Sequence, residues 1–417
     1  MKIGLQTWGS DGDIRPFMAL AGGLSTAGHD VTVAFTSVDN KEYSSLACAM
    51  NFKSVNVNKV INYTAQDLTE MIKPRSNLKQ KILVLKTFFE PVVDEMYAAS
   101  LALGRENDLV ISHAVTHTLL TAAEKYNRPR VVLVLCPIVT RTAYAPPIGR
   151  PNFGKLINTL LWRYEDYVTG KKCYPSANTI RAKERLPSIK SFQEQAYMSK
   201  DLTLIAASPS ICEKQPDWQD NIQICGFFDV PCSAEKVDVP DELQAFLNAG
   251  DPPVYMTFGS LTQYNLEQAT HLMVNALKHS GRRAIIQSDW DHLPKIPDSP
   301  NIYKIKRIPH HGIFPHCSLV VHHGGVGTSH TSLRCGCPSV VVEHAVDQIY
   351  WGQQLHRIGV AGEPLHKRSV TPEKLACAMN AVLNCPGMMK TAKAIGAAVK
   401  NEQGVRRAVE LIENRFG

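Results

Sequence analysis

The sequence predicts an α/β protein with two successive domains, each built around a parallel sheet. The first 35 residues read as strand, glycine-rich turn, helix and strand, the unit from which parallel sheets are assembled. Near-continuous apolar runs recur along the first half, as expected of strands buried on both faces. The same alternation restarts after residue 240, behind a stretch with prolines and charges but no periodicity. At about 150 residues per domain, a chain of 417 residues is expected to form two or three domains.

The first expected strand covers residues 2–7 and runs into the turn WGSDGD. The helix that follows has an apolar face at spacings of three and four, formed by Ile14, Phe17, Met18, Ala21 and Leu24. Pro16 lies in the first helical turn, where its missing N–H costs little, and Gly28 ends the helix. Residues 31–35 form the next strand, and the short connections indicate parallel pairing.

Further strands are expected in both halves of the chain. Those of the first half cover residues 108–112, 130–137, 202–207 and 222–226. Those of the second half cover residues 252–260, 282–287, 301–306, 318–323 and 339–344. We therefore expect domains at 1–230 and 241–417, joined by a linker at 231–240. A second arrangement, in which the last helix packs on the first domain, is also compatible with the sequence. Two such halves fit an architecture of two Rossmann-like domains facing a cleft.

Composition narrows the class of protein. Hydrophobic residues make up 44% of the chain and charged residues 20%, a composition that excludes a disordered chain. The net charge is +7, but the basic residues form no dense block, so nucleic acid is not an expected partner. The longest apolar run, residues 131–139, is far shorter than the roughly 20 residues of a membrane span, and the start does not resemble a signal peptide. The 11 cysteines follow no regular spacing of the kind seen in disulfide-bonded secreted proteins, so reduced thiols and a cytoplasmic location are expected. The basic net charge is also compatible with peripheral contact with an anionic membrane surface.

Two insertions, residues 60–100 and 141–200, do not follow the strand–helix alternation. The second contains a helical apolar face made of Phe153, Leu156, Ile157, Leu160, Leu161, Tyr164 and Val168. The more common interpretation is a helix packed on its own domain. The alternative is an apolar lip for a lipophilic ligand or a membrane surface.

The strongest chemical signal lies in residues 307–352. SLVVHH is a buried strand, and HGGVGT is a glycine-rich turn that opens a helix. Backbone amides at a helix start bind anions, and glycine lets a phosphate come close. His322, at the strand end, can donate a hydrogen bond or a charge to that anion. The glycines only loosely approximate the dinucleotide fingerprint, so a dehydrogenase is a weak alternative.

The whole segment 307–352 closely resembles the donor-binding motif of the family 1 nucleotide-sugar glycosyltransferases with the GT-B fold. It is most similar to the branch of microbial sterol glucosyltransferases and glycopeptide-antibiotic glucosyltransferases. The matching parts are Ile308-Pro309-His310, the stretch from His322 to Thr328, and Asp347-Gln348. WGSDGDIRP near the N-terminus and TFGSL in the second half resemble two further motifs of this branch. No motif covers the insertions.

The resemblance implies an acceptor-binding first domain and a donor-binding second domain. The residues implied to contact the donor diphosphate are His322, Gly324, Val326, Gly327, Thr328, Ser260, Gly259, Ser10 and Gly12. It implies that Ile308 meets uracil through its backbone and that Asp347 and Gln348 bind sugar hydroxyls. His330 stands where plant relatives often have a ribose-binding glutamate, so the resemblance assigns no ribose contact.

The resemblance also implies that Asp13 is the general base. An acceptor alcohol is a weak nucleophile until a carboxylate takes its proton. Asp13 follows a strand end and opens a helix, so a helix-capping role is the alternative, and the two roles are compatible. His113 and His117 follow the strand 108–112 at the edge where open parallel sheets bind ligands, and either could line an acceptor pocket.

Metal and cofactor sites are not expected. Two D-x-D sequences, at 11–13 and 289–291, are short enough to arise by chance. The six histidines between residues 310 and 330 match no zinc-ligand spacing, and Cys335 and Cys337 are one residue short of a C-x-x-C pair.

The sequence therefore predicts an inverting, metal-independent transfer of a hexose from a UDP-sugar to a hydroxyl of a lipophilic acceptor. UDP-glucose is the default donor by resemblance and is a substrate rather than a cofactor. The acceptor is expected to be a sterol, a lipid or a polycyclic natural product. Two alternatives remain open: a nucleotide-sugar epimerase on the same scaffold, and a non-catalytic nucleotide-sugar-binding partner protein.

Overall fold

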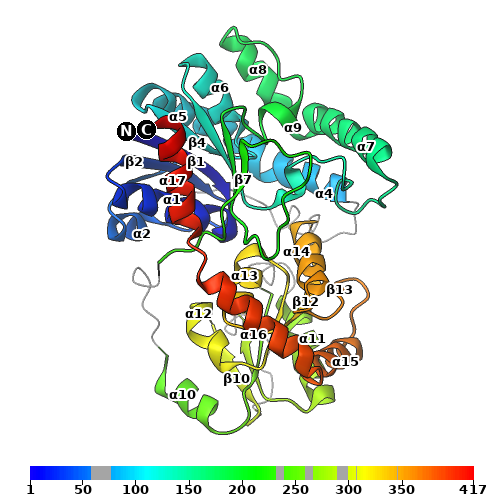
Figure 1. Cartoon of the computed structure of the whole chain (residues 1–417). Helices are drawn as coiled ribbons and strands as arrows, with labels where there is room; N and C mark the ends of the chain where they lie inside the picture. Colours follow the sequence, from blue (N-terminus) through cyan, green and yellow to red (C-terminus); the bar gives the residue numbers. More distant parts are fainter. Residues whose placement is uncertain (58–76, 232–238, 259–265, 289–298, 307, 345) are drawn as a thin grey trace. The chain divides into compact units, whose positions relative to one another are not determined.

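The computed structural model describes residues 1–57, 77–231, 239–258, 266–288, 299–306, 308–344 and 346–417. The chain forms two compact units (Figure 1). Unit 1 comprises Met1–Ala234 and Gln403–Gly417, and unit 2 comprises Glu235–Glu402. Most of the expected linker, residues 232–238, lies outside the described residues. The last 15 residues return to unit 1, so the first unit is built from both ends of the chain.

Unit 1 contains a seven-stranded parallel sheet of order β3-β2-β1-β4-β5-β6-β7. Its strands are β1 (Lys2–Gly9), β2 (Asp30–Ser37), β3 (Lys53–Asn56), β4 (Leu109–His113), β5 (Arg130–Val134), β6 (Leu202–Ile205) and β7 (Ile222–Ile224). In register, Leu5 of β1 lies between Val33 of β2 and Ile111 of β4. The winding direction reverses between β1 and β4, and ligands bind at such switch points, outside the carboxyl ends of the strands.

The described α-helices of unit 1 are α1 (Asp11–Thr26), α2 (Ser44–Ala49), α4 (Asn77–Val84), α5 (Val93–Glu106), α6 (His117–Lys125), α7 (Lys155–Val168), α8 (Pro175–Lys183), α9 (Phe192–Gln195) and α17 (Gly404–Phe416). Of these, α1, α5 and α6 pack against the central strands of the sheet. The apolar face predicted for α1 is fully buried. Helix α17 lies beside α1 (Figure 1), and its Ala408 and Ile412 join the same apolar core.

Unit 2 contains a six-stranded parallel sheet of order β10-β9-β8-β11-β12-β13. Its strands are β8 (Val254–Thr257), β9 (Ala284–Gln287), β10 (Ile302–Ile305), β11 (Leu319–His322), β12 (Ser339–Glu343) and β13 (Leu365–His366). Its helices are α10 (Asp241–Asn248), α11 (Leu266–Ser280), α12 (His310–Ile313), α13 (Val326–Arg334), α14 (Val346–Arg357), α15 (Pro372–Leu383) and α16 (Pro386–Lys400). Two apolar clusters pack on this sheet, one including Met273 and Met379, the other Leu243 and Phe314. The predicted fold class, two α/β domains with parallel sheets, is confirmed.

Helix α7 differs from the more common interpretation of its sequence. The helix forms, but Leu156, Leu160 and Tyr164 of its predicted apolar face are exposed. Leu161 of that face is half-buried and Val168 is buried, together with Asn158 and Trp162. Most of the predicted apolar face therefore lies on the outer side of this helix, and only its C-terminal end, at Val168, is buried in unit 1.

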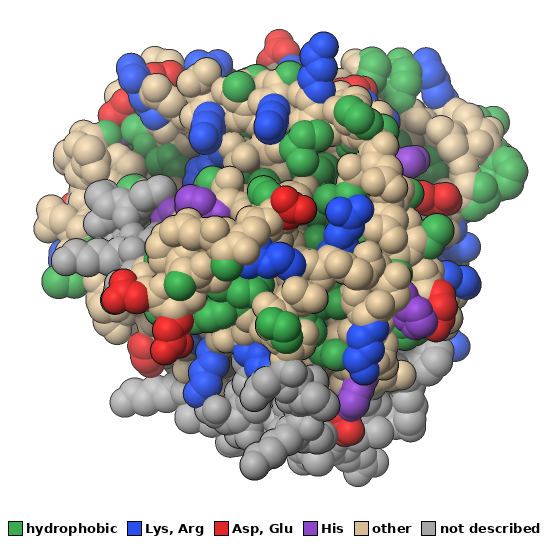
Figure 2. Space-filling view, turned by 90° about the horizontal axis from the view of Figure 1, so that it is seen from below, with side chains coloured by type: hydrophobic (Ala, Val, Ile, Leu, Met, Phe, Trp, Pro, Cys, Tyr) green, Lys and Arg blue, Asp and Glu red, His purple; other side chains and the backbone are tan. Residues whose placement is uncertain are grey.

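In the part of the chain that the structure describes, no helix combines the length and the apolarity of a membrane span. Lys and Arg side chains are interspersed with acidic and hydrophobic ones on the face shown in Figure 2. This scattered arrangement is in line with the lack of a dense basic block in the sequence.

Candidate functional site

The glycine-rich loop of unit 2 connects β11 to α13 at the carboxyl edge of the sheet. Gly324 has a φ of +87°, and a Cβ there would lie 2.9 Å from the carbonyl oxygen of Gln348. A Cβ at Gly325 would clash with Nε2 of His323. Gly327, in the first turn of α13, has open space instead, because a Cβ added there would have no atom within 4 Å. Packing therefore explains the first two glycines, whereas the third leaves the helix start accessible to a ligand.

His322 ends β11 with its side chain fully buried. The backbone N–H of Gly324 donates to its Nδ1 atom at 3.0 Å, which assigns the ring proton to Nε2. That Nε2 atom has no hydrogen-bond partner among the described residues. Burial, together with the nearby His323 and His310, holds the pKa of His322 well below its usual 6.5. At neutral pH the ring is therefore uncharged and offers one N–H, so it can donate a hydrogen bond but not a positive charge.

The other residues of the donor motif belong to α13, to α14 and to the segment before α12. Thr328 is buried in the first turn of α13, and Val326 begins that helix half-buried. The side chain of Ile308 is buried in an apolar cluster with Phe314, which leaves its backbone as the part that could meet a base. Asp347 lies in the first turn of α14. These positions match the order of the motif, and their roles stay predictions.

Gln348 has a structural contact that the sequence did not reveal. Its Oε1 atom accepts a hydrogen bond from the backbone N–H of His344 at 2.8 Å, and its side chain is buried. Its own carbonyl oxygen faces Gly324. Gln348 therefore ties the start of α14 to the end of β12 and to the glycine-rich loop. Only the approach of these segments in space could show this contact.

His330 lies in the middle of α13, and its side chain is buried. Its Nδ1 atom lies 2.9 Å from the carbonyl oxygen of Val326, and its ring meets Trp351 edge-on at 5.0 Å. Burial lowers the pKa of His330 to about 4. The residue thus contributes to the interior of unit 2. Gly259, Ser260 and the sequence 289–291 lie outside the described residues.

In unit 1, Asp13 lies in the first turn of α1, directly after β1. Its Oδ2 atom accepts hydrogen bonds from the backbone N–H of Ser10 at 2.8 Å and from the hydroxyl of Ser10 at 3.2 Å. The N-cap residue of α1 is Ser10, and Asp13 is the third helical residue, whose carboxylate accepts from the N-cap amide; Asp13 therefore takes part in a capping box but is not itself the N-cap. These two hydrogen bonds lower the pKa of Asp13, but desolvation by burial raises it more, and the nearby charge of Asp39 adds a smaller increase. The resulting pKa of Asp13 is about 6. A carboxylate of this pKa is mostly ionised at pH 7 yet more basic than an ordinary aspartate, which suits a proton acceptor.

The position of Asp13 depends on Gly9, whose φ is +140°. A Cβ at Gly9 would clash with Oδ2 of Asp13. Gly9→Ala should therefore displace the carboxylate and lower turnover by about tenfold or more, because misplaced catalytic groups lose much of their effect. Steady-state kinetics and thermal melting would measure this. Gly387→Ala, where no atom lies within 4 Å, is the matched control. Full activity of a folded Gly9→Ala protein would contradict the role of this contact.

Ser10 and Gly12 belong to the same turn. Ser10 is half-buried and Gly12 is exposed. Asp11 is engaged by the hydroxyl of Tyr43 at 2.8 Å and by Lys41 at 3.7 Å. The carboxylates of Asp11 and Asp13 therefore have different partners. Among the described residues, no three His, Cys, Asp or Glu side chains come together as a metal site would require.

His113 and His117 lie at the end of β4 and the start of α6, as the sequence predicted. His117 is only 1% exposed, with its ring between those of Phe89 and Tyr174 at 5.4 and 5.2 Å. His113 packs against Phe17 at 5.6 Å. Burial lowers the pKa of His113 to about 4 and that of His117 to about 3. Both rings belong to the interior of unit 1, and contact with an acceptor stays a prediction.

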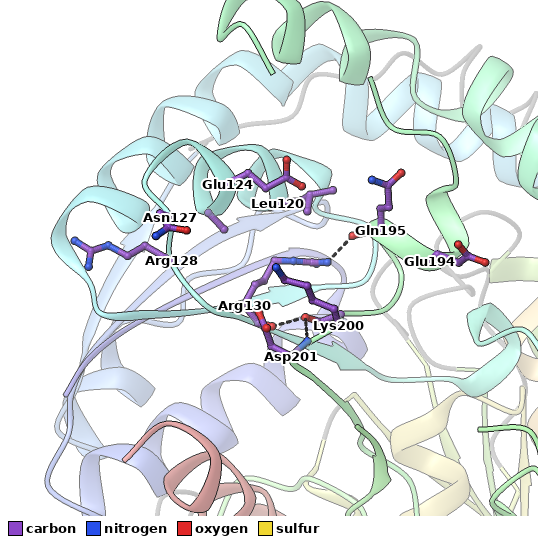
Figure 3. A pocket seen from close by; sticks show the side chains of 11 residues that line it. Leu120, Glu124, Asn127, Arg128, Arg130, Glu194, Gln195, Lys200 and Asp201 are labelled. Carbon is purple, nitrogen blue, oxygen red and sulfur yellow. Dashed lines mark hydrogen bonds between the residues drawn. The ribbon is translucent and has the colours of Figure 1, made fainter. Parts of the chain in front are cut away.

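A pocket of about 330 Å³ lies at the opposite edge of this sheet, near the amino ends of β5 and β6 (Figure 3). The guanidinium of Arg130 at its centre donates to the carbonyl oxygens of Gln195, Ala196 and Met198. Arg130 therefore holds the segment before β6 in place. Ligands of open parallel sheets bind at the carboxyl edge, so this pocket is not the candidate site.

Residues 273–405 match the family model of the erythromycin biosynthesis protein CIII-like C-terminal domain. The chain is 27% identical to a sterol 3-beta-glucosyltransferase of Arabidopsis thaliana over 98% of its own length and 65% of the relative's, so it spans about two thirds of that relative. It is also 27% identical to the vancomycin aglycone glucosyltransferase of Amycolatopsis orientalis, over 86% of this chain and 85% of that one.

Solved structures show the same fold. The glycosyltransferase VinC in complex with dTDP has a TM-score of 0.67 and 20% identity, covering 100% of this chain and 99% of that one. The glycotransferase of kitacinnamycin has a TM-score of 0.71 and 16% identity, over 100% and 99% of the two chains. Together these findings confirm the resemblance of the chain to the family 1 glycosyltransferases and show that it has the GT-B fold.

Proposed function

We propose that the protein is an inverting glycosyltransferase that moves a hexose from a UDP-sugar to a hydroxyl group of a lipophilic acceptor. The main observation behind this proposal is the neutral His322, whose Nε2–H has no partner among the described residues and lies beside a glycine-rich helix start. UDP-glucose is the proposed donor. The relatives named for sterols and for the vancomycin aglycone support a sterol, lipid or polycyclic acceptor.

On the donor side, the proposed diphosphate site is formed by His322, the loop amides and the first turn of α13. The N-terminus of this nine-residue helix carries partial positive charge. When the bond between the anomeric carbon and the diphosphate oxygen breaks, negative charge develops on the leaving oxygen. Donors that are already in place stabilise that charge without reorganisation. Asp347 and Gln348 are proposed to bind hydroxyl groups of the transferred sugar.

On the acceptor side, Asp13 is proposed to take the proton from the attacking hydroxyl. The acceptor oxygen forms a bond to the anomeric carbon on the face opposite the diphosphate, and UDP leaves with the electron pair of the broken bond. This displacement inverts the anomeric configuration. With a pKa of about 6, the carboxyl group of Asp13 is mostly ionised at pH 7 and ready to accept the proton.

The proposed reaction needs no divalent metal, because His322 and the helix start take the place of a cation on the diphosphate. Activity should therefore survive an excess of EDTA and should not rise when Mg²⁺ or Mn²⁺ is added. Release of UDP, followed by a coupled assay, measures this. If EDTA abolished turnover and a divalent ion restored it, the metal-independent mechanism would be wrong and the D-x-D sequences would need a new assignment.

The reaction itself is tested with a panel of UDP- and TDP-sugars and of sterol, flavonoid and macrolide acceptors, because a related structure holds dTDP. Mass spectrometry should detect an acceptor heavier by one hexose, with the anomeric configuration read by NMR. Accumulation of an epimerised donor without any glycosylated acceptor would contradict the proposal. A cytoplasmic location with peripheral membrane contact is part of the proposal, supported by the ten described cysteines, which form no disulfide with one another.

A further inference from the structure

Unit 1 exposes an apolar surface along α7, which we name the α7 stripe. It comprises six side chains that are 39–75% exposed: Phe153, Leu156, Ile157, Leu160, Tyr164 and Tyr167. Among the described residues, only Val55 and Tyr144 are comparably exposed large hydrophobic residues outside it, and Tyr144 contacts Lys155 of α7. Exposed apolar side chains are usually scattered singly, and a contiguous group marks a binding surface.

The stripe is not needed to hold α7 on unit 1. Leu156, Leu160 and Tyr164 follow one another at intervals of four, so they share one side of the helix. The other side is anchored by Asn158, which donates to the carbonyl oxygen of Ala143 at 2.9 Å. Trp162 likewise donates from its indole nitrogen to the carbonyl oxygen of Ala145 at 2.9 Å. Polar substitutions in the stripe should therefore leave the fold intact.

The charges around the stripe are unequal. The exposed charged residues of α7 and of the five residues that follow it are all basic, and we name them the basic border: Lys155, Arg163, Lys171 and Lys172. The two acidic residues of α7 have partners within unit 1. Glu165 pairs with Lys81 at 3.7 Å, and Asp166 accepts from the backbone N–H of Gln193 at 3.0 Å.

Two of these lysines lie over tyrosine rings of the same surface. The Nζ atom of Lys155 is 4.2 Å from the ring centre of Tyr144, and that of Lys171 is 4.7 Å from that of Tyr167. The surface thus combines leucine and phenylalanine side chains with tyrosines and a basic border. Tyrosines favour the level of lipid headgroups, and aliphatic side chains favour the acyl region below it.

We propose that the α7 stripe docks on the surface of a bilayer that contains anionic lipid. The basic border matches the negative charge of such a surface, and the stripe supplies apolar side chains that enter the boundary between headgroups and chains. A second copy of the chain fits less well, because a symmetric contact would bring the same basic residues together. The inference also bears on the proposed function, since a lipophilic acceptor dissolves in membranes.

The test uses the whole chain and sedimentation with phosphatidylcholine vesicles, prepared with and without phosphatidylserine. The chain should sediment with the phosphatidylserine vesicles, and salt should weaken this binding. Leu156→Ser with Leu160→Ser should lower the partition coefficient by roughly tenfold or more, from the usual free energy of burying a leucine. Val55→Ser, which changes a 48% exposed valine on β3, should bind as the parent does.

The basic border is tested with one double variant and a control double variant of equal charge change. Lys171→Glu with Lys172→Glu should lower binding to phosphatidylserine vesicles by roughly tenfold or more. Lys390→Glu with Lys400→Glu changes the net charge by the same amount on α16 of unit 2 and should have a much smaller effect. In addition, Leu156→Trp should show an emission shifted to shorter wavelength when phosphatidylserine vesicles are added, relative to the parent protein.

Several outcomes would overturn the proposal. The parent chain could remain in the supernatant with phosphatidylserine vesicles, or the Leu156→Ser, Leu160→Ser protein could sediment as the parent does. Loss of a concentration-dependent dimer in that variant, without vesicle binding, would assign the stripe to self-association. A higher KM for a detergent-dissolved acceptor at unchanged vesicle binding would make it an acceptor surface. Turnover of a water-soluble acceptor, measured in parallel, separates failure of the docking proposal from failure of the proposed function.

Discussion

Replacing Asp13 with asparagine should lower turnover by about 10²–10⁴-fold, the usual contribution of a general base, while UDP affinity stays close to that of the parent. Asparagine retains a side-chain oxygen that can accept the 2.8 Å hydrogen bond from the Ser10 amide, so the start of α1 should keep its cap. It cannot take a proton from the acceptor. Steady-state kinetics measure the first effect, and calorimetric titration with UDP measures the second.

The neighbouring carboxylate provides the control. Asp11 is held by Tyr43 and Lys41, and Asp11→Asn removes the same formal charge from the same turn. Its turnover should stay within about tenfold of the parent, because it removes no proton acceptor from the proposed reaction. If Asp13→Asn also retained nearly full turnover, Asp13 would serve only in the capping box and another base would have to be found.

The pH dependence follows from the raised pKa of about 6. The base acts in its ionised form, so kcat/KM should be level above pH 7 and fall as the pH drops through about 6. Asp13→Asn should lose this acidic limb.

The contribution of Asp13 to folding stability should change with pH in the opposite direction to its contribution to activity. Because the folded-state pKa lies above the ordinary 3.8, protonated Asp13 favours folding at low pH, and this contribution is lost as the pH rises through about 6. Thermal melting of both proteins between pH 4 and 7 would show that loss only in the parent.

Much of the fold could be predicted because its elements have long, clear patterns. The apolar face of α1 and the buried strands β4 and β11 follow directly from residue spacing. Strand β13 could not be predicted, since it has only two residues and forms by pairing with β12, where Leu365 lies beside Val342. Its short length leaves no periodicity to detect.

The sequence of α7 predicted a helix with one apolar side but not the direction in which that side faces. Burial of an apolar side is the usual outcome. Here Asn158 and Trp162 find backbone acceptors in residues 143–145, and these contacts turn the apolar side outward. The partners come from an irregular segment without periodicity, so local spacing carries no information about them.

The candidate site shows the same limit. Motifs identified His322, Gly324 and Asp13, but their geometry depends on atoms that approach each other in space. The Gly324 amide decides which ring nitrogen of His322 carries the proton. The absence of a side chain at Gly9 leaves room for the carboxylate of Asp13. The sequence motifs identify these residues, but contacts between them in space determine their protonation and position.

Replacing His322 with alanine should lower donor affinity by roughly 10- to 150-fold, because a hydrogen bond to a charged group contributes about 1.5–3 kcal/mol. The loss should be equal for UDP and for UDP-glucose, since the proposed contact is to the diphosphate. Asp347→Ala should behave in the opposite way, with UDP affinity kept and turnover of the intact donor reduced. Calorimetry with both ligands on both variants measures these effects.

Two further variants separate the donated hydrogen bond from a purely structural role of His322. His322→Asn keeps an acceptor near the Gly324 amide but removes the Nε2–H, whereas His322→Gln keeps an N–H at longer reach but shifts the acceptor. If the diphosphate accepts the Nε2–H, glutamine should restore more affinity than asparagine. Rescue by asparagine alone would show that His322 only holds the glycine-rich loop. Because the low pKa of His322 keeps its ring neutral, UDP-glucose affinity should also be constant between pH 6.5 and 8. An affinity that rose steadily toward pH 6.5 would instead indicate a protonated ring on the diphosphate.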